Sequence, residues 1–413
     1  MKRRRNRKKE TNDLKLYGWG KEFSHTKILP VGCDFWISFL TVIIAVIGVV
    51  AVLSASMTVS STIQDIKTGH VLIKQSGVAL IGIGVMHFME KHFSLNFLKS
   101  EAFFFGVFIL GGFLLAPLAW PATYGARAWI YIGSFTLQPS EFAKVYVILI
   151  MAAYCGDIKR HYENSYELVK RPLGMIIAYA LIIKSLQSDF GSMMVMLLIA
   201  FMCLLVPNNK QLRPWQRVLS ILAVIALIAG YYLSTPSGVG YVRKLDFMAD
   251  YKKGRFESCA LPFGDMFNDS MHIANSLIAQ ARGGLLGNGI GKSLSKYYVF
   301  PARTTDFILA IMVEETGFLG FFVIFLLYAS LVLRLYKYAS RIQSEKARII
   351  LVGTASYIAI HFIFNVGGVT AAIPLTGIPL LMISSGGTSL LSTMICIGMA
   401  QGVIRQYHRG EII

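Results

Sequence analysis

The sequence predicts an all-α membrane protein that crosses the bilayer about ten times. Of its 413 residues, 55% are hydrophobic and only 15% are charged, and the mean hydropathy is +0.57. A water-soluble domain carries roughly 25% charged residues, so this composition argues against a soluble enzyme. Apolar runs of about 17 to 25 residues recur along the whole chain, which is the length an α-helix needs to cross ~30 Å of hydrocarbon.

Ten apolar segments are placed as spans, of which the fourth to sixth are short and weakly separated. They are residues 35–55, 71–89, 102–119, 140–155, 173–186, 191–206, 216–233, 306–335, 347–367 and 388–405. Basic residues follow spans four, six and eight, and they put both termini in the cytoplasm under the positive-inside rule. The expected organisation is a basic cytoplasmic tail (1–33), a membrane domain (34–405) with a large outer loop (234–305), and a cytoplasmic C-terminal tail (406–413).

The N-terminal tail is strongly basic. Residues 1–33 hold ten Lys and Arg against three acidic residues, and so supply +7 of the net charge of +18. Beside a membrane span, such a run is typical of a topogenic signal and of contact with anionic membrane lipids rather than with nucleic acid. The five cysteines are odd in number and scattered, so no intramolecular disulfide is expected.

The outer loop 234–305 is expected to have structure of its own. Long connectors tend to be functional or disordered, and apolar positions such as Ile273 and Leu277 predict short helices on the membrane surface. The Gly-rich GGLLGNGIG at 283–291 lacks the context of a phosphate loop, so tight turns and close helix packing are predicted there. The loop's basic residues fit either an anionic substrate headgroup or outer-leaflet phosphates.

Charged residues inside spans are costly and mark a second region of interest. Glu141 and Lys144 follow Pro139 on one face of a helix, three residues apart, and are predicted to pair. A structural ion pair and a substrate contact by Lys144 are the two alternatives. Asp189 in LQSDFG needs a partner and is interpreted as structural.

The sequence TTDFILAIMVEETGFLG predicts a helix capped by Thr304 or Thr305, with Asp306 in its first turn. Glu314 and Glu315 interrupt the apolar stretch that follows, so the start of this helix is expected to line a water-filled cavity that opens outward. Further on, IPLTGIPLLMISSGGTSLL places prolines and glycines in apolar sequence. It predicts a broken or re-entrant segment buried against protein.

Four motifs in one order carry a family resemblance. They are GARAWIYIGSFTLQPSEFAK (125–144), LQSDFGS (186–192), SLIAQARGGLLGNGIGKSLSKYYVFPARTTDFILAIMVEETGFLG (276–320) and NVGGVTAAIPLTGIPLLMISSGGTSLL (365–391). Across essentially all spans the chain resembles the SEDS family (shape, elongation, division and sporulation), whose members include FtsW, RodA and SpoVE. It departs from the family's usual forms at Ala128, Ala302, Leu381 and Ser385. SAS at 54–56 and the IPLTGIP segment tilt the resemblance toward the FtsW and SpoVE type.

The resemblance implies a peptidoglycan glycosyltransferase at the outer face of the bacterial cytoplasmic membrane. Its substrate would be lipid II, a disaccharide-pentapeptide on undecaprenyl pyrophosphate. Its partners would be a class B penicillin-binding protein and other division or elongation proteins, and not nucleic acid. No cofactor is assigned, and a divalent metal (Mg²⁺ or Mn²⁺) is left open. The rival interpretations are a flippase for the lipid-linked precursor and a non-catalytic division scaffold.

The resemblance also implies a catalytic aspartate eleven residues before the serine that opens the SLIA-like helix. Counting back from Ser276 gives Asp265, with Asp269 and Asp250 as alternatives and a solvated turn residue as the non-catalytic interpretation. A carboxylate there can act as general base on the acceptor hydroxyl. For Arg127, a phosphate clamp and an interfacial anchor are the two alternatives. The candidate substrate-binding residues are Arg127, Lys144, Glu141, His272, Asp306 and Glu314, and no metal ligand is assigned.

Overall fold

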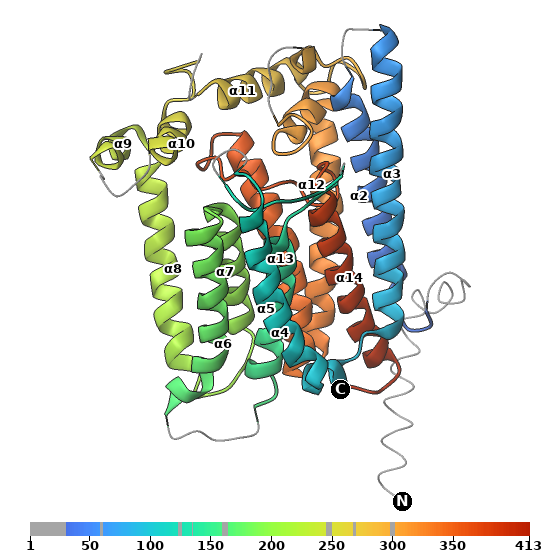
Figure 1. Ribbon diagram of the computed structural model, residues 1–413, viewed down its shortest axis with the longest axis vertical. Coiled ribbons are helices and arrows are strands. Elements are labelled where there is room, and N and C mark those ends of the chain that lie inside the picture. Colours follow the sequence, from blue (N-terminus) through green and yellow to red (C-terminus); the bar gives the residue numbers. More distant parts are fainter. Residues whose placement is uncertain are drawn as a thin grey trace, which may run out of the picture.

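The protein is a bundle of long, roughly aligned helices with a layer of short helices across one end (Figure 1). The computed structural model describes residues 30–57, 61–122, 126–133, 135–158, 164–244, 250–266, 270–297 and 302–413. Almost all of the predicted basic tail lies outside these residues, as does Asp269. The multi-pass helical class predicted from composition is confirmed.

Ten long helices make up the bundle in the described part of the chain. They are α2 (Phe35–Ser56), α3 (Ser61–His92), α4 (Glu101–Leu115), α5 (Pro139–Cys155), α6 (Ser165–Leu181), α7 (Phe190–Leu204), α8 (Arg213–Leu233), α12 (Ile308–Arg341), α13 (Glu345–Val369) and α14 (Gly387–His408). Seven of these helices are long and apolar enough to span a membrane. Helix α4 is counted among them together with its 3-10 extension η3 (Ala116–Ala119). The predicted spans four to six correspond to α5, α6 and α7, which have 17, 17 and 15 residues.

The two ends of the bundle differ. Residues near both chain termini meet at one end, which we call the terminal end. There His408 Nδ1, in the last turn of α14, lies 2.7 Å from Gly32 O. Helix α14 therefore continues three residues into the predicted C-terminal tail. The opposite end, called the loop end, carries the short helices expected from the sequence of the outer loop. These are α9 (Pro236–Arg243), α10 (Asp250–Ala260) and α11 (Met271–Gly283).

A small β-hairpin at the loop end departs from the all-α expectation. Strands β1 (Ile130–Ile132) and β2 (Phe135–Leu137) pair antiparallel, with Ile130 opposite Leu137 and Ile132 opposite Phe135. A strand of three residues is too short for its alternation of apolar and polar positions to distinguish it from a polar connector. Shorter helical turns complete the described secondary structure: the 3-10 turns η2 (Leu95–Lys99) and η5 (Ser295–Tyr297), and the π-turn η4 (Ile182–Leu186).

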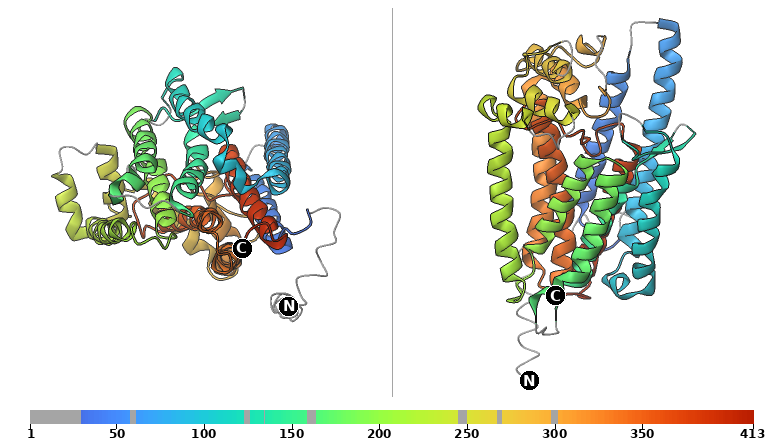
Figure 2. Two further views of the ribbon diagram at one scale, coloured as in Figure 1. Left: turned by 90° about the horizontal axis from the view of Figure 1, so that it is seen from below. Right: turned by 60° about the vertical axis from the view of Figure 1, so that its left-hand side comes forward.

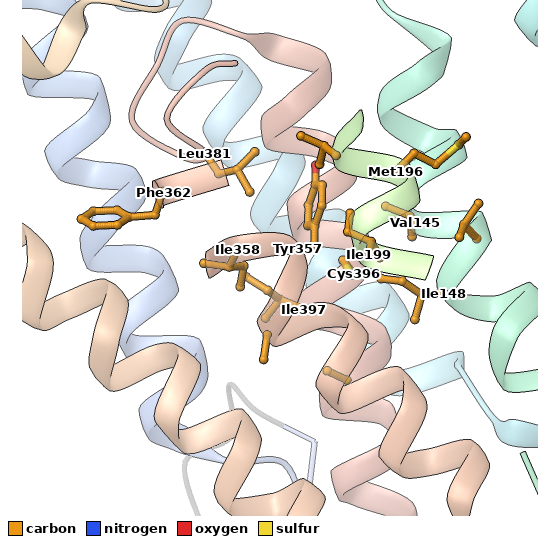
Figure 3. Packing of buried hydrophobic residues seen from close by; sticks show 14 of the residues in the cluster. Val145, Ile148, Met196, Ile199, Tyr357, Ile358, Phe362, Leu381, Cys396 and Ile397 are labelled. Atoms are coloured by element: carbon orange, nitrogen blue, oxygen red, sulfur yellow. The ribbon is translucent and has the colours of Figure 1, made fainter. Parts of the chain in front are cut away.

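Helices α5, α7, α13 and α14 form the core, and α8 stands at its margin. In the core, Tyr357 packs among Val145, Ile148, Met196 and Ile199, all of them buried (Figure 3). Such interdigitation supplies the dispersion contacts that hold helices together where lipid replaces water. Helix α8 contributes no buried residue, and Figure 2 shows it at the edge of the bundle.

Helices α2 and α12 are joined by polar contacts at both of their ends. At the terminal end, Arg334 donates from Nε and Nη2 to Asp34 Oδ1 and Oδ2, at 2.7 Å each, and Tyr338 OH donates to Oδ2 at 2.6 Å. At the loop end, Ser54 Oγ donates to the Glu315 carboxylate at 2.6 Å. The two helices are thereby fixed in register.

Helix α12 is broken near its start, and the Gly-rich loop 283–291 repairs the break. Gly317 has φ +70° and ψ −173°, which interrupts the regular helical hydrogen bonds. Two loop amides donate to freed helix carbonyls, and two helix amides donate back to the loop. The four bonds are Asn288 N to Glu314 O (3.0 Å), Gly289 N to Glu315 O (2.9 Å), Phe318 N to Gly284 O (2.9 Å) and Leu319 N to Leu285 O (3.1 Å). The predicted tight glycine turns are confirmed, whereas the backbone break at Gly317 was not predicted from the sequence.

The start of α12 corrects one prediction. The helix begins at Ile308 with Phe307 as its N-cap and without a side-chain cap, so neither Thr304 nor Thr305 caps it. Asp306 accordingly precedes the first turn instead of lying in it. The reason is a tight turn upstream: Ala302 has φ +55°, and its carbonyl accepts from Thr305 Oγ1 at 3.2 Å.

The segment between α13 and α14 is non-helical, as predicted for apolar sequence interrupted by Pro and Gly. Residues 378–386 are buried or half-buried, whereas Thr370, Ala372 and Gly377 are exposed. Its free backbone groups find side-chain partners, which such backbone requires at membrane depth. Ser384 Oγ accepts from Leu380 N at 2.9 Å and donates to Thr305 O at 2.7 Å. Asn365 Nδ2 donates to Ile378 O at 2.9 Å. We call residues 370–386 the re-entrant segment.

Candidate active site at the loop end

Asp265 lies exposed on the turn between α10 and α11. The turn is closed by a hydrogen bond from Ser270 N to Asp265 O at 3.1 Å. The flanking helices are tied to the start of the re-entrant segment and to the end of α13. Cys259 Sγ on α10 donates to Ala371 O at 3.2 Å, and Ser276 Oγ on α11 donates to Val369 O at 2.8 Å. The predicted base therefore sits on an anchored turn at the surface of the loop end, where a large headgroup can reach it.

Asp306 lies half-buried where α10, α12, α13 and the re-entrant segment meet. Burial raises the pKa of its carboxyl to about 6, although the positive charge of Arg255 on α10 and a hydrogen bond from Thr305 act to lower it. Asn365 Nδ2 donates to Asp306 O at 2.9 Å. A Cβ built at Gly377 would lie 3.6 Å from Asp306 Oδ2, so the re-entrant segment approaches the carboxylate closely. The proximity of Arg255 to Asp306 was not predicted from the sequence.

His272 is carried by the first turn of α11 and faces the start of α12. Its ring centroid lies 6.0 Å from that of Phe307, the residue after Asp306. Burial lowers the pKa of His272, which favours the neutral imidazole. Within the described residues, its buried Nδ1 has no hydrogen-bond partner. The structure thus brings His272 and Asp306, two of the predicted substrate-binding residues, to the same junction.

Arg127 belongs to a different part of the loop end, beside the hairpin. Its side chain is exposed, and its backbone N–H donates to Gln187 O at 2.9 Å. The nearby Asp189 has the partner that the sequence required: it accepts from Gln138 Nε2 at 2.8 Å and from Ser192 N at 3.0 Å. Asp189 is therefore the N-cap of α7 and links that helix to the start of α5.

Glu141 and Lys144 form the predicted ion pair in the core of the bundle. The Lys144 Nζ to Glu141 Oε1 distance is 2.6 Å, and both side chains are almost fully buried. Tyr357 OH donates to Glu141 Oε2 at 3.1 Å, and Lys144 Nζ lies 3.3 Å from His361 Nε2. His361 Nδ1 in turn lies 3.3 Å from Pro379 O of the re-entrant segment. Sequence reasoning missed Tyr357 and His361, although two polar residues four apart in an apolar helix were the available signal.

Glu314 is fully buried, and its carboxylate accepts hydrogen bonds from residues that follow the Gly-rich loop. Ser293 Oγ donates to its carboxylate, and the amides of Leu294 and Ser295 donate at 3.2 Å each. The adjacent Glu315 lies 3.5 Å from Nζ of Lys296, another fully buried side chain. These contacts account for Glu314 as an anchor for residues 293–296, a role distinct from the predicted substrate contact.

Comparison with known proteins places the chain in a family. The family described as "Cell cycle protein", FtsW/RodA/SpoVE, matches residues 35–409. The chain belongs to this family. A relative from Bacillus subtilis (strain 168), "Probable peptidoglycan glycosyltransferase FtsW", is 29% identical over 376 residues, which is 90% of each chain. "Stage V sporulation protein E" from the same organism is 30% identical over 373 residues, 90% of this chain and 97% of that one.

Two solved structures share the fold of this FtsW/RodA/SpoVE family member. One is reported under "Structural coordination of polymerization and crosslinking by a peptidoglycan synthase complex", with a TM-score of 0.66 at 23% identity over 91% of this chain and 98% of that chain. The other is the Rod shape determining protein RodA from Thermus thermophilus, with a TM-score of 0.58 at 24% identity over 91% and 97%. At these identities the likeness establishes the fold alone.

Proposed function

We propose that this chain is a peptidoglycan glycosyltransferase that polymerises lipid II into glycan strands at the outer face of the bacterial cytoplasmic membrane. The observation that carries the proposal is the match, over 90% of both chains, to a relative named as a peptidoglycan glycosyltransferase. In this topology the loop end faces outward and the terminal end faces the cytoplasm. Lys210, Lys337 and Lys346, which lie at or near connectors of the terminal end, support this orientation.

In the proposed reaction, a sugar hydroxyl of the acceptor attacks the anomeric carbon of the donor, and the lipid pyrophosphate leaves. Asp265 takes the proton of the attacking hydroxyl as general base. Arg255, beside Asp306, offers positive charge to the leaving pyrophosphate. For Arg127, which lies beside the hairpin, a phosphate clamp and an interfacial anchor remain the two alternatives. The free Nδ1 of His272, among the described residues, offers a hydrogen bond to the sugar headgroup.

The buried groups are assigned supporting roles. Glu141 and Lys144 satisfy one another in the core, which favours the structural ion pair over a substrate contact by Lys144. Over the described ranges, no three or more His, Cys, Asp or Glu side chains gather as a metal site.

A class B penicillin-binding protein is the proposed partner. The structural neighbour described as a peptidoglycan synthase complex that coordinates polymerisation with crosslinking supports this assignment. The FtsW and stage V sporulation relatives favour a role in division or sporulation over one in elongation.

Purified protein supplied with lipid II in detergent, alone and with candidate penicillin-binding proteins, tests the activity on a glycan-strand gel. Wild-type protein should make strands, and Asp265→Asn should lower the rate by about 10²–10⁴-fold, because an amide has no useful basicity near pH 7. Asp250→Asn is the matched control in the same loop and should stay active. If the wild type makes no strands with any partner, the flippase and scaffold interpretations replace this one. If Asp265→Asn stays active, the base is Asp306 or Asp269.

A further inference from the structure

A groove opens between α2 and α12 near the terminal end, far from the candidate active site. Its volume is about 390 Å³. It is lined by Trp36, Leu40, Ser330, Leu333, Arg334 and Lys337.

The two cations lie at one end of the groove, and the rest is lined by apolar residues and the small polar Ser330. On α12, the lining residues from Ser330 to Lys337 recur every three or four positions and so share one helix face. They span about 10 Å along the axis at 1.5 Å per residue. Because α12 ends and α2 begins at the terminal end, Arg334 and Lys337 lie toward the membrane surface. Leu40 and Leu333 lie deeper.

The polar end carries net positive charge. Arg334 is held by its two bonds to Asp34, and within the described residues its Nη1 makes no hydrogen bond. Its side chain is 33% exposed, whereas that of Asp34 is 3% exposed and lies behind it. Lys337 is exposed and has no ion pair in the described part of the chain. Two cations against one buried carboxylate leave +1 at the mouth of the groove.

We infer that this groove binds an anionic phospholipid of the leaflet at the terminal end. Its phosphate lies between Arg334 and Lys337, and an acyl chain follows Leu40 and Leu333. Basic pockets between transmembrane helices suit such headgroups, and the indole of Trp36 suits the depth of the interface. An apolar membrane span of a partner would leave the net positive charge at Arg334 and Lys337 without an opposite charge, whereas a lipid phosphate supplies one. A lipid therefore fits better than a partner's membrane span.

Native mass spectrometry of the full chain in detergent, titrated with phosphatidylglycerol or with zwitterionic phosphatidylcholine, tests this inference. Phosphatidylglycerol should bind more tightly. Lys337→Gln should weaken phosphatidylglycerol binding about fivefold, since one surface cation contributes about 1 kcal/mol. Ser330→Phe places a bulky ring at the deeper end of the groove without changing charge, and should weaken phosphatidylglycerol binding as well. Lys210→Gln removes an exposed lysine from the connector between α7 and α8 at the same end, and should leave the affinity unchanged.

Four results would overturn the inference. Equal binding of the two lipids would remove the charge selectivity. Equal losses in Lys210→Gln and Lys337→Gln would indicate attraction to the whole surface instead of a site. Phosphatidylglycerol binding that survives Ser330→Phe, or a co-purified protein released by Lys337→Gln in place of lipid, would assign the groove to another occupant. Unchanged thermal midpoints of all three variants would show that folding is not the cause.

Discussion

Replacing Gly287 by alanine tests the repair of the α12 break by the Gly-rich loop. Gly287 has φ +78°, and an added Cβ would lie 2.2 Å from the backbone oxygen of Glu315. Real Cβ atoms do not come so close to a backbone atom, so the loop must move away from the helix. Gly291 is a matched control because its φ is +80° and an added Cβ meets nothing within 4 Å.

The expected losses follow from these two environments. Each alanine carries the left-handed backbone penalty of roughly 1–2 kcal/mol. Only Gly287→Ala also displaces the bonds that Asn288 N and Gly289 N make to the freed carbonyls, at about 1 kcal/mol each. We expect the free energy of unfolding to fall by about 3–4 kcal/mol in Gly287→Ala and by about 1–2 kcal/mol in Gly291→Ala.

Thermal unfolding of the two purified variants in detergent measures the difference. Gly287→Ala should have the clearly lower midpoint and the lower folded yield. Equal losses in the two variants would refute the reasoning, because backbone conformation alone would then explain both and the contact with Glu315 would carry no weight.

Two further predictions concern charged groups. Glu141→Ala and Lys144→Ala should each destabilise the protein by about 3–5 kcal/mol, because either change leaves a buried charge without its partner. The double variant should lose less stability than the sum of the two single variants. Additive losses in thermal midpoint would contradict the pairing. Arg255→Gln removes a charge that lowers the pKa of Asp306, so this pKa should rise above about 6 and more of the carboxyl should be protonated at neutral pH. Carbodiimide labelling of Asp306, followed by mass spectrometry across pH, should show the midpoint moving upward, and a midpoint unchanged from that of the control Arg243→Gln would contradict the assigned contact.

The features predictable from sequence are those that the membrane or a short helical spacing imposes. Lipid forces each apolar run into a helix, so run lengths located the bundle helices. The three-residue spacing of Glu141 and Lys144 was enough to predict their contact, because neighbours at that spacing share a helix face. Prolines and glycines within apolar sequence located the re-entrant segment for a related reason, since they cannot continue a regular helix.

The features that escaped prediction depend on distant approach or on single backbone angles. Arg255 and Asp306 are brought together because α10 packs against the start of the re-entrant segment, a long-range contact that no local sequence pattern predicts. Thr304 and Thr305 satisfied the composition of a helix cap, but the positive φ of Ala302 redirected the chain before the helix began. The buried contacts of Glu314 arise in the same way, because the Gly-rich loop folds back onto α12.

The contacts that fix α2 against α12 also set an order of events during synthesis. Asp34 precedes its partner Arg334 by 300 residues, and Ser54 precedes Glu315 by 261. At about 5–20 residues per second, the ribosome needs roughly 15–60 s to cover the longer interval. Throughout that time α2 resides in the membrane without the arginine that neutralises its capping carboxylate. Its own apolar character must hold it there, and α2 is the most apolar of the seven span-length helices.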